Sequence, residues 1–157
     1  MNVALHASVM LTVAGRTPLL AAPHLARAVC AGLDSCAPLA PGRLWGYVVL
    51  PDAARLVLGP CDDTALEDFV ACLKAETTAR VLSAIRRTED TEALDAVLRF
   101  NPVWGGALYR LWQTGFHCTW LYNAFQLDGA LATLCQAPVR AGLIARGNAW
   151  PYCWLSG

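Results

Sequence analysis

Three histidines and seven cysteines are among the side chains of this chain that could hold a metal ion or act as nucleophiles. The histidines lie far apart, and no two cysteines have CxxC spacing, so the pattern does not predict a zinc site. His117 and Cys118 are adjacent, but neighbouring residues of a strand point to opposite faces and cannot form a catalytic pair. The odd cysteine count and the lack of a cationic leader predict reduced thiols in a cytoplasmic protein.

Arginine supplies eleven of the twelve basic side chains, and Lys74 is the only lysine. Guanidinium groups bind carboxylates and phosphates through paired hydrogen bonds, although a GC-rich coding sequence also produces this bias. The formal net charge is zero, which argues against indiscriminate binding to nucleic acid. Nine acidic side chains lie between Asp62 and Asp95, whereas the four arginines from Arg99 onward are opposed only by Asp128. This distribution predicts either a basic surface in the C-terminal third or an ordinary solvated one.

The length and composition predict a single domain that spans residues 1–157. A chain of 157 residues buries a core without disulfide or metal support. Its apolar fraction of 56% argues against disorder and leaves open a homodimer or partner interface. No apolar run reaches the ~18–20 residues that cross a bilayer, so we expect no membrane partner.

Apolar periodicity and turn residues predict the elements that must position any site. Strands are expected at about 2–13, 43–50, 54–59 and 116–121, and helices at about 23–36, 62–87, 89–100 and 124–136. The order strand, helix, strand, strand, helix, strand predicts an α+β fold. We expect a ferredoxin-like sandwich, in which helices pack on an antiparallel sheet.

Several residues mark the expected boundaries of the helices. Pro23 suits a first helical turn, and Asp62 or Asp63 can cap the long second helix. Thr88 is a candidate cap for the third helix, which Asn101-Pro102 would end before a loop through Gly105-Gly106. Pro138 is expected to end the last helix, and the Trp-rich tail after it is expected to be irregular.

Five segments occur together in an order and spacing that resemble a known family. They read LWGYVVLPDAARLVL at 44–58, LKAETTAR at 73–80, LWQTGFH at 111–117, APVRAGLI at 137–144 and WPYCWLS at 150–156. Each segment is similar to a motif of the REP-associated branch of the single-tyrosine HUH transposases. The resemblance covers residues 2 to 156, and only the stretch 88–103 has no place in the pattern.

The resemblance implies a DNA-cutting enzyme whose chemical groups are missing here. Family members cut single-stranded DNA with Mg²⁺ or Mn²⁺ held by two histidines and with a tyrosine on a late helix. In this chain the histidine positions hold Ala53 and Arg55, and the tyrosine position falls at about Thr133. A methyl group ligates nothing, Arg55 brings a positive charge, and Gln136 is one weak remaining ligand. We therefore expect a degenerate HUH motif, no catalytic residues and no metal cofactor.

The resemblance then predicts a protein that binds structured single-stranded DNA, such as a hairpin, without cleaving it. The expected phosphate contacts are Arg55, Lys74, Arg80, Arg110 and Arg140. One alternative is a protein-interaction or homodimeric module with no role in nucleic-acid binding. A second alternative is an active strand transferase in which Tyr109, Tyr122 or Tyr152 replaces the missing tyrosine.

Overall fold

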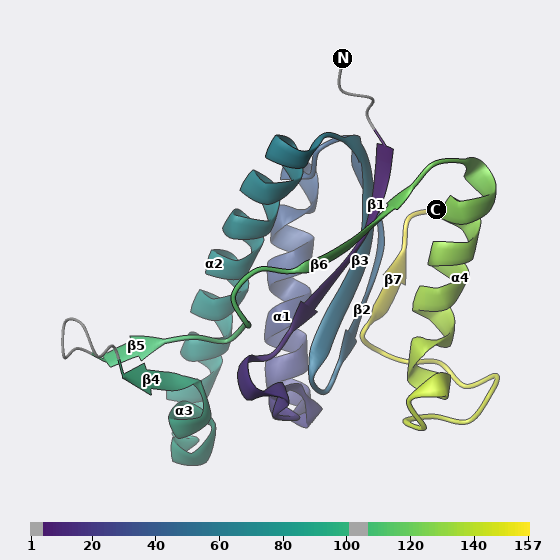
Figure 1. Ribbon diagram of the computed structural model, residues 1–157. Helices are drawn as coiled ribbons and strands as arrows, with labels where there is room; N and C mark the ends of the chain where they lie inside the picture. Colours follow the sequence, from purple (N-terminus) through teal and green to yellow (C-terminus); the bar gives the residue numbers. More distant parts are fainter. Residues whose placement is uncertain (1–4, 101–106) are drawn as a thin grey trace.

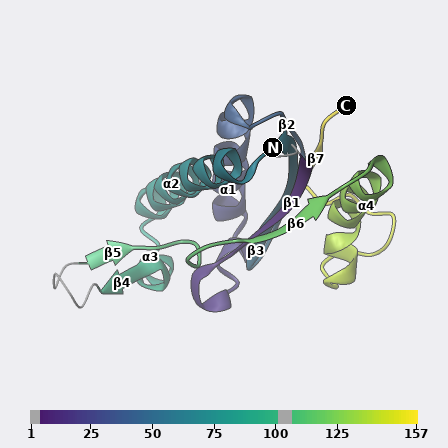
Figure 2. The same cartoon turned by 45° about the horizontal axis from the view of Figure 1, so that its top comes forward.

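An antiparallel sheet of five strands lies at the centre of the computed structural model, which describes residues 5–100 and 107–157 (Figure 1). The strands are β1 (Leu5–Thr12), β2 (Arg43–Leu50), β3 (Ala53–Cys61), β6 (His117–Leu121) and β7 (Cys153–Leu155), in the order β6-β1-β3-β2-β7. Helices α1 (Pro23–Cys36) and α2 (Asp63–Thr88) pack on one face, and α4 (Ala124–Arg140) packs on the other (Figures 1 and 2). The α+β, ferredoxin-like prediction is confirmed, with β7 added beside β2.

The hairpin of β2 and β3 forms the middle of the sheet. Its two-residue turn is Pro51-Asp52, as the sequence indicates. The carbonyl of Asp52 accepts a hydrogen bond from Val13 N, and that of Pro51 accepts one from Leu20 N, at 2.8 and 2.9 Å. These bonds fix the turn against the chain that follows β1.

Local signals set the starts of the helices. Pro23 occupies the first turn of α1, and the Asp62 carboxylate caps α2 by accepting a hydrogen bond from Ala65 N at 2.8 Å. The two helices approach closely at Gly32, where an added Cβ would lie 2.8 Å from Thr77 Cγ2. Glycine at this position therefore lets α1 and α2 pack tightly on the sheet.

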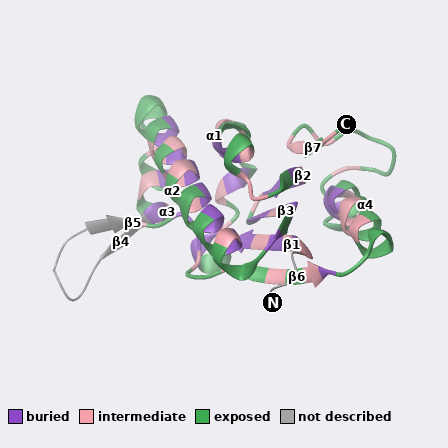
Figure 3. Cartoon of the chain, turned by 90° about the horizontal axis from the view of Figure 1, so that it is seen from above, coloured by how far each residue is buried: buried purple, intermediate pink, exposed green. Residues whose placement is uncertain are grey.

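The core is divided between the two faces of the sheet (Figure 3). The main cluster fills the space between the sheet and the helices α1 and α2, and it includes Leu11, Leu25, Leu33, Leu56 and Leu58. A smaller cluster lies under α4, and its buried members are Val48, Leu50, Val57, Leu121, Leu134 and Ala137. None of the helices that the structure describes is long and apolar enough to cross a membrane.

The prediction of one helix over 89–100 is wrong. Glu89 adopts a left-handed conformation that ends α2, and α3 covers only Thr91–Val97. The helix α3 is capped by Asp90, which accepts a hydrogen bond from Ala93 N at 3.0 Å. Thr88, the predicted cap, is instead the last residue of α2. Strand β4 (Leu98–Phe100) follows and pairs with β5 (Ala107–Tyr109). The expected helix stop at Asn101-Pro102 and the Gly105-Gly106 loop lie outside the described residues.

Two predictions for the C-terminal region are also wrong. Pro138 does not end α4 but lies in its last turn, where it is buried and its carbonyl accepts a hydrogen bond from Leu143 N at 2.9 Å. The tail is not irregular throughout, because β7 pairs with β2. Val49 N donates to the Tyr152 carbonyl and Ser156 N donates to the Trp45 carbonyl, both at 2.8 Å, at the two ends of this pairing.

Candidate functional site on the sheet face beneath α4

One row of side chains crosses all five strands on the face that α4 covers. Residues directly opposite one another in a sheet share a face. The register therefore aligns His117, Met10, Arg55, Val48 and Cys153 from β6 to β7. Because Val48 belongs to the cluster beneath α4, the whole row lies on this face. Arg55 is its central member.

Helix α4 covers only one half of this face. Val48, Leu50 and Val57, on β2 and β3, are buried beneath it. On the β6 side the exposed Thr119 is paired with the half-buried Ser8 of β1. The uncovered half therefore carries polar side chains, and Met10 is its member directly opposite Arg55.

Arg55 has a buried hydrogen-bond donor that nothing in the described chain satisfies. Its side chain is half-buried, and the Nε atom is buried without a partner among the described residues. An unpaired buried donor destabilises a fold by about 1–3 kcal/mol, and by more when it is charged. Because a guanidinium binds oxyanions through two parallel hydrogen bonds, Arg55 is suited to a phosphate oxygen.

His6 adds a second unpartnered atom to the same face. It pairs with Leu121, which belongs to the cluster beneath α4, and its Nε2 atom is buried with no partner in the part of the chain that the structure describes. Its ring contacts Trp45 edge-on at 5.5 Å, and the Arg43 guanidinium lies 4.3 Å from the centre of the Trp45 ring. Aromatic and guanidinium planes of this kind can stack on unpaired bases.

The residues at the family's metal and nucleophile positions do not fit a divalent cation. Ala53 is buried on β3, in the row next to Arg55, and offers only a methyl group. On α4, the Thr133 hydroxyl donates to the Gly129 carbonyl at 2.9 Å, and the Gln136 side chain accepts from Arg140 at 2.8 Å. Mg²⁺ and Mn²⁺ need several oxygen or nitrogen ligands, which this set does not supply. Within residues 5–100 and 107–157, no group of three His, Cys, Asp or Glu side chains could hold a metal ion.

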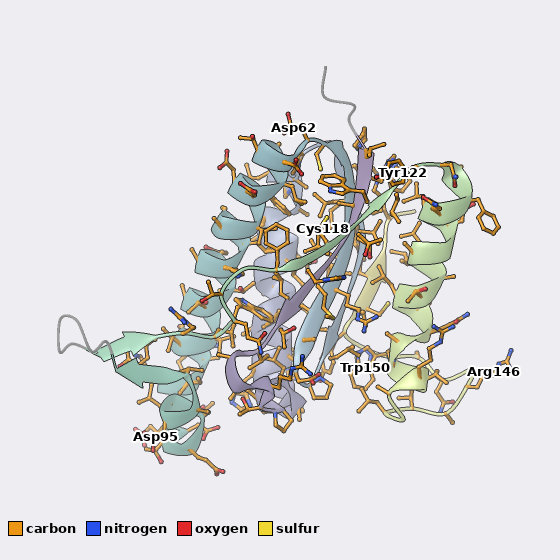
Figure 4. All side chains as sticks on the ribbon, viewed as in Figure 1. Asp62, Asp95, Cys118, Tyr122, Arg146 and Trp150 are labelled. Atoms are coloured by element: carbon orange, nitrogen blue, oxygen red, sulfur yellow. The ribbon has the colours of Figure 1, made fainter. Side chains whose placement is uncertain are left out.

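The three alternative tyrosines lie in different places. Tyr122 is 69% exposed where β6 meets α4, at the opposite end of that helix from Trp150 (Figure 4). Tyr152 is half-buried and packs edge-on against Trp150 at 5.4 Å. Tyr109 lies beneath the Arg86 guanidinium, which is 5.5 Å from the centre of its ring.

The five expected phosphate contacts do not share one surface. Lys74 and Arg110 lie together beside α2, where Lys74 Nζ donates to the carbonyls of Gln113, at 2.8 Å, and Gly115. Arg80 forms an ion pair with Glu76 on α2 at 2.7 Å. Arg140 lies at the end of α4, and Arg55 lies beneath that helix. Sequence reasoning missed the neighbours of Arg55 on β1 and β6, because strand register is set by long-range pairing.

Neither a family model nor a curated protein matches the sequence. The structure, however, is similar to that of a REP-associated tyrosine transposase bound to a REP hairpin. The TM-score is 0.59 at 16% sequence identity, over 96% of this chain and 76% of that one. The chain has the fold of this transposase. A presumed transposase from Deinococcus radiodurans R1 is also similar, with a TM-score of 0.48 and 19% identity, over 92% of this chain and 95% of that one.

Two of the transposase-like segments form one buried unit of this transposase fold. The Thr77 hydroxyl, from 73–80, accepts a hydrogen bond from Trp112 Nε1, from 111–117, at 2.8 Å and donates to the Leu73 carbonyl at 2.8 Å. Both side chains are buried. Lys74 joins the same two segments through its bonds to backbone carbonyls. These segments therefore have a structural role that does not depend on cleavage.

The closing segment at 150–156 is also explained by the transposase fold. It forms β7 and the residues before it, and Trp150 Nε1 donates to the Val49 carbonyl at 2.8 Å. Ser156 Oγ accepts hydrogen bonds from the Arg43 guanidinium. The segment thus extends the sheet at its β2 edge.

Proposed function

We propose that the protein binds single-stranded DNA that carries a hairpin and does not cleave it. The observation that carries this proposal is Arg55, whose buried Nε has no partner in the described chain, at the centre of the sheet face beneath α4. The fold supports it, because a transposase of this fold is known with a REP hairpin bound. Arg55 would hold a DNA phosphate where the family holds a metal ion.

The positive charge of the half-buried Arg55 favours an anion as its partner. A half-buried guanidinium with an unpaired donor is destabilising until an anion reaches it. A phosphate would accept from Nε and from one terminal nitrogen, which restores the lost hydrogen bonds and neutralises the charge. The polar half of the face, with Ser8 and Thr119, leaves the approach from β6 open.

The same residues support binding without cleavage. Strand transfer by a tyrosine needs a nucleophile and a cation that neutralises the developing charge on the phosphate. Ala53 cannot ligate a metal ion, and the Thr133 hydroxyl donates to its own helix. An arginine can bind the ground-state phosphate, but it supplies no attacking group.

Fluorescence anisotropy with three labelled DNAs tests the proposal. A single strand with a hairpin should bind more tightly than a linear strand or a duplex, and the affinity should fall log-linearly with salt. Arg55→Met keeps the aliphatic stem and should weaken hairpin binding by about 10- to 100-fold, the effect of losing hydrogen bonds to a charged group. The control is Arg146→Met, on the exposed loop after α4 (Figure 4). Flat traces for all three DNAs would refute DNA binding.

Incubation with Mg²⁺ or Mn²⁺ tests the second half of the proposal. The hairpin strand should stay intact, and neither ion should raise the melting temperature at sub-millimolar concentration. Ala53→His, Arg55→His and Thr133→Tyr together should restore metal binding first. Metal-dependent nicking that disappears in Tyr109→Phe or Tyr122→Phe would instead establish an active enzyme with a relocated nucleophile.

A second candidate, an interaction module without DNA, is favoured by the β7 edge of the sheet. Strand β7 is an outer strand, and Trp154 and Leu155 on it are 40% and 43% exposed. An apolar outer strand can pair with another chain. A molar mass that doubles with concentration in light scattering, together with no DNA affinity, would select this function.

A further inference from the structure

A groove of about 510 Å³ lies between α2 and the chain from Tyr109 to Gly115, apart from the α4 face. Lys74, Thr78 and Leu82 line it from α2 at intervals of four residues, which places them on one side of the helix. Because α2 and α4 pack on opposite faces of the sheet, this groove and Arg55 belong to different surfaces (Figures 1 and 2).

The groove is positively charged. Lys74 and Arg110 both line it, and no aspartate or glutamate of the described chain does. Burial, and then the charge of Arg110, lower the pKa of Lys74 below its usual value. Arg86 adds a third cation at the Tyr109 end. The two lining cations therefore repel each other, and an anion between them would relieve this repulsion.

Hydrogen-bond donors are already positioned in the groove. Two of the three ammonium donors of Lys74 go to the carbonyls of Gln113 and Gly115, so the side chain is held in place with one donor left. The exposed guanidinium of Arg110 has no acceptor among the residues that the structure describes. Because the Lys74 ammonium is already held, it loses little conformational entropy when a ligand binds, and only the Arg110 side chain has to be ordered.

We propose that this groove binds a phosphate group between Lys74 and Arg110. Lysine would act as a fixed point charge, and arginine would contribute two parallel hydrogen bonds. The hydroxyls of Thr78 and Thr114, which also line the groove, provide further donors. A nucleic-acid backbone and a free phosphate compound share this chemistry, and the experiments distinguish the two sources.

Titration with inorganic phosphate tests the site without DNA. In NMR spectra recorded at constant ionic strength with chloride, the amides of Thr114 and Gly115 should shift and saturate in the low-millimolar range. Arg110→Gln should weaken the binding at least tenfold. This exposed position is chosen because Lys74→Met would remove the bonds that hold the loop. Arg87→Gln, an exposed change on α2 outside the groove, should leave the titration unchanged.

A linear labelled oligonucleotide tests nucleic acid as the source. If a backbone phosphate occupies the groove, Arg110→Gln should reduce the slope of log affinity against log salt by about 0.7, the value for one contact with a single strand. Phosphate shifts with an unchanged slope would assign the site to a free phosphate compound. Phosphate shifts no larger than those with chloride, or shifts that saturate at the same phosphate concentration in Arg110→Gln, would overturn the proposal. The phosphate titration is independent of Arg55, so hairpin binding and this site can fail separately.

Discussion

The two faces of the sheet differ in how completely they satisfy their polar groups. On the face beneath α1 and α2, Leu56 and Leu58 are fully buried, and the buried hydroxyl of Thr77 makes hydrogen bonds to Trp112 and to its own helix. On the face beneath α4, two buried nitrogens on the strands themselves, in His6 and Arg55, have no partner in the described chain. The unpartnered buried atoms of the α1 side, Thr17 Oγ1 and His24 Nε2, lie outside the sheet, in the chain after β1 and in the first turn of α1. On the first face the strands contribute apolar core and satisfied polar groups, and on the second they carry the unpartnered donor that our proposal assigns to a ligand.

This difference shows why similarity of fold to an enzyme does not by itself imply the same activity. The motif residues that persist in this chain, such as Thr77 and Trp112, hold the fold together. The positions that the family's chemistry needs, Ala53, Arg55 and Thr133, lie on the other face or on the helix that covers it. A substitution at one of these positions leaves the main core intact, so the fold does not depend on the residues that the family's chemistry needs.

Truncating one leucine on each face should give the largest effects. Leu56→Ala should lower the free energy of unfolding by about 3–5 kcal/mol, because the core between the sheet and the two helices has little freedom to close a cavity. Leu134→Ala should lower it by only about 2–3 kcal/mol, because α4 can move toward a smaller cluster. Urea unfolding measures both. Equal losses would contradict the contrast between the faces.

Removing one hydroxyl from each side of the molecule should give a smaller contrast. Thr77→Val leaves the buried Nε1 of Trp112 without its acceptor and should destabilise the protein by about 1–3 kcal/mol. Thr133→Val, where the hydroxyl bonds only to Gly129 on its own helix, should change stability by less than about 0.5 kcal/mol. The midpoint of thermal unfolding compares the two variants, and a larger loss for Thr133→Val would count against our assignment.

Alkaline pH should lower the free energy of unfolding through the Cys30 thiol, which lies on α1. Burial, and then the charge of Asp34, raise the pKa of the Cys30 thiol from 9.0 to about 11. The folded state thus favours the neutral thiol, so this contribution to stability is complete below pH 9 and is lost as the pH rises through about 11. Urea midpoints between pH 8 and 11 should fall less steeply in Cys30→Ala. Parallel curves would show that this thiol does not contribute.

The smallest expected change in stability comes from Arg55→Met. Replacing a half-buried, unpaired cation by an apolar side chain of similar length should leave stability unchanged or raise it by up to about 1 kcal/mol. Hairpin binding should weaken by about 10- to 100-fold in the same variant. A destabilised Arg55→Met protein would mean that Arg55 supports the fold and is not held for a ligand.

The sequence predicts those elements whose signals are local. Pro23 and Asp62 mark the starts of α1 and α2, and the apolar run at 43–50 matches β2 residue for residue. Strands β4, β5 and β7 each contain three residues and exist only through their pairing partners, so no periodicity identifies them.

In the candidate sites, too, the sequence predicts what is local and misses what depends on long-range pairing. Arg55 could be singled out from its position in a motif, but its unpartnered Nε and its neighbours Met10 and His117 depend on strand register. Lys74 could be predicted as a cation, whereas its bonds to the carbonyls of residues 113 and 115 join segments about forty residues apart. Such contacts are consequences of tertiary packing, which one sequence does not encode locally.

The close approach of Gly32 to Thr77 restricts the order in which these positions can evolve. A methyl group at position 32 would lie 2.8 Å from Thr77 Cγ2 but 3.3 Å from its Cα. Thr77→Ser removes the obstructing Cγ2 and keeps the hydroxyl that Trp112 needs. Alanine at position 32 therefore requires only a small shift of the two helices in a lineage that first acquires serine at position 77, whereas the reverse order passes through a clashing intermediate.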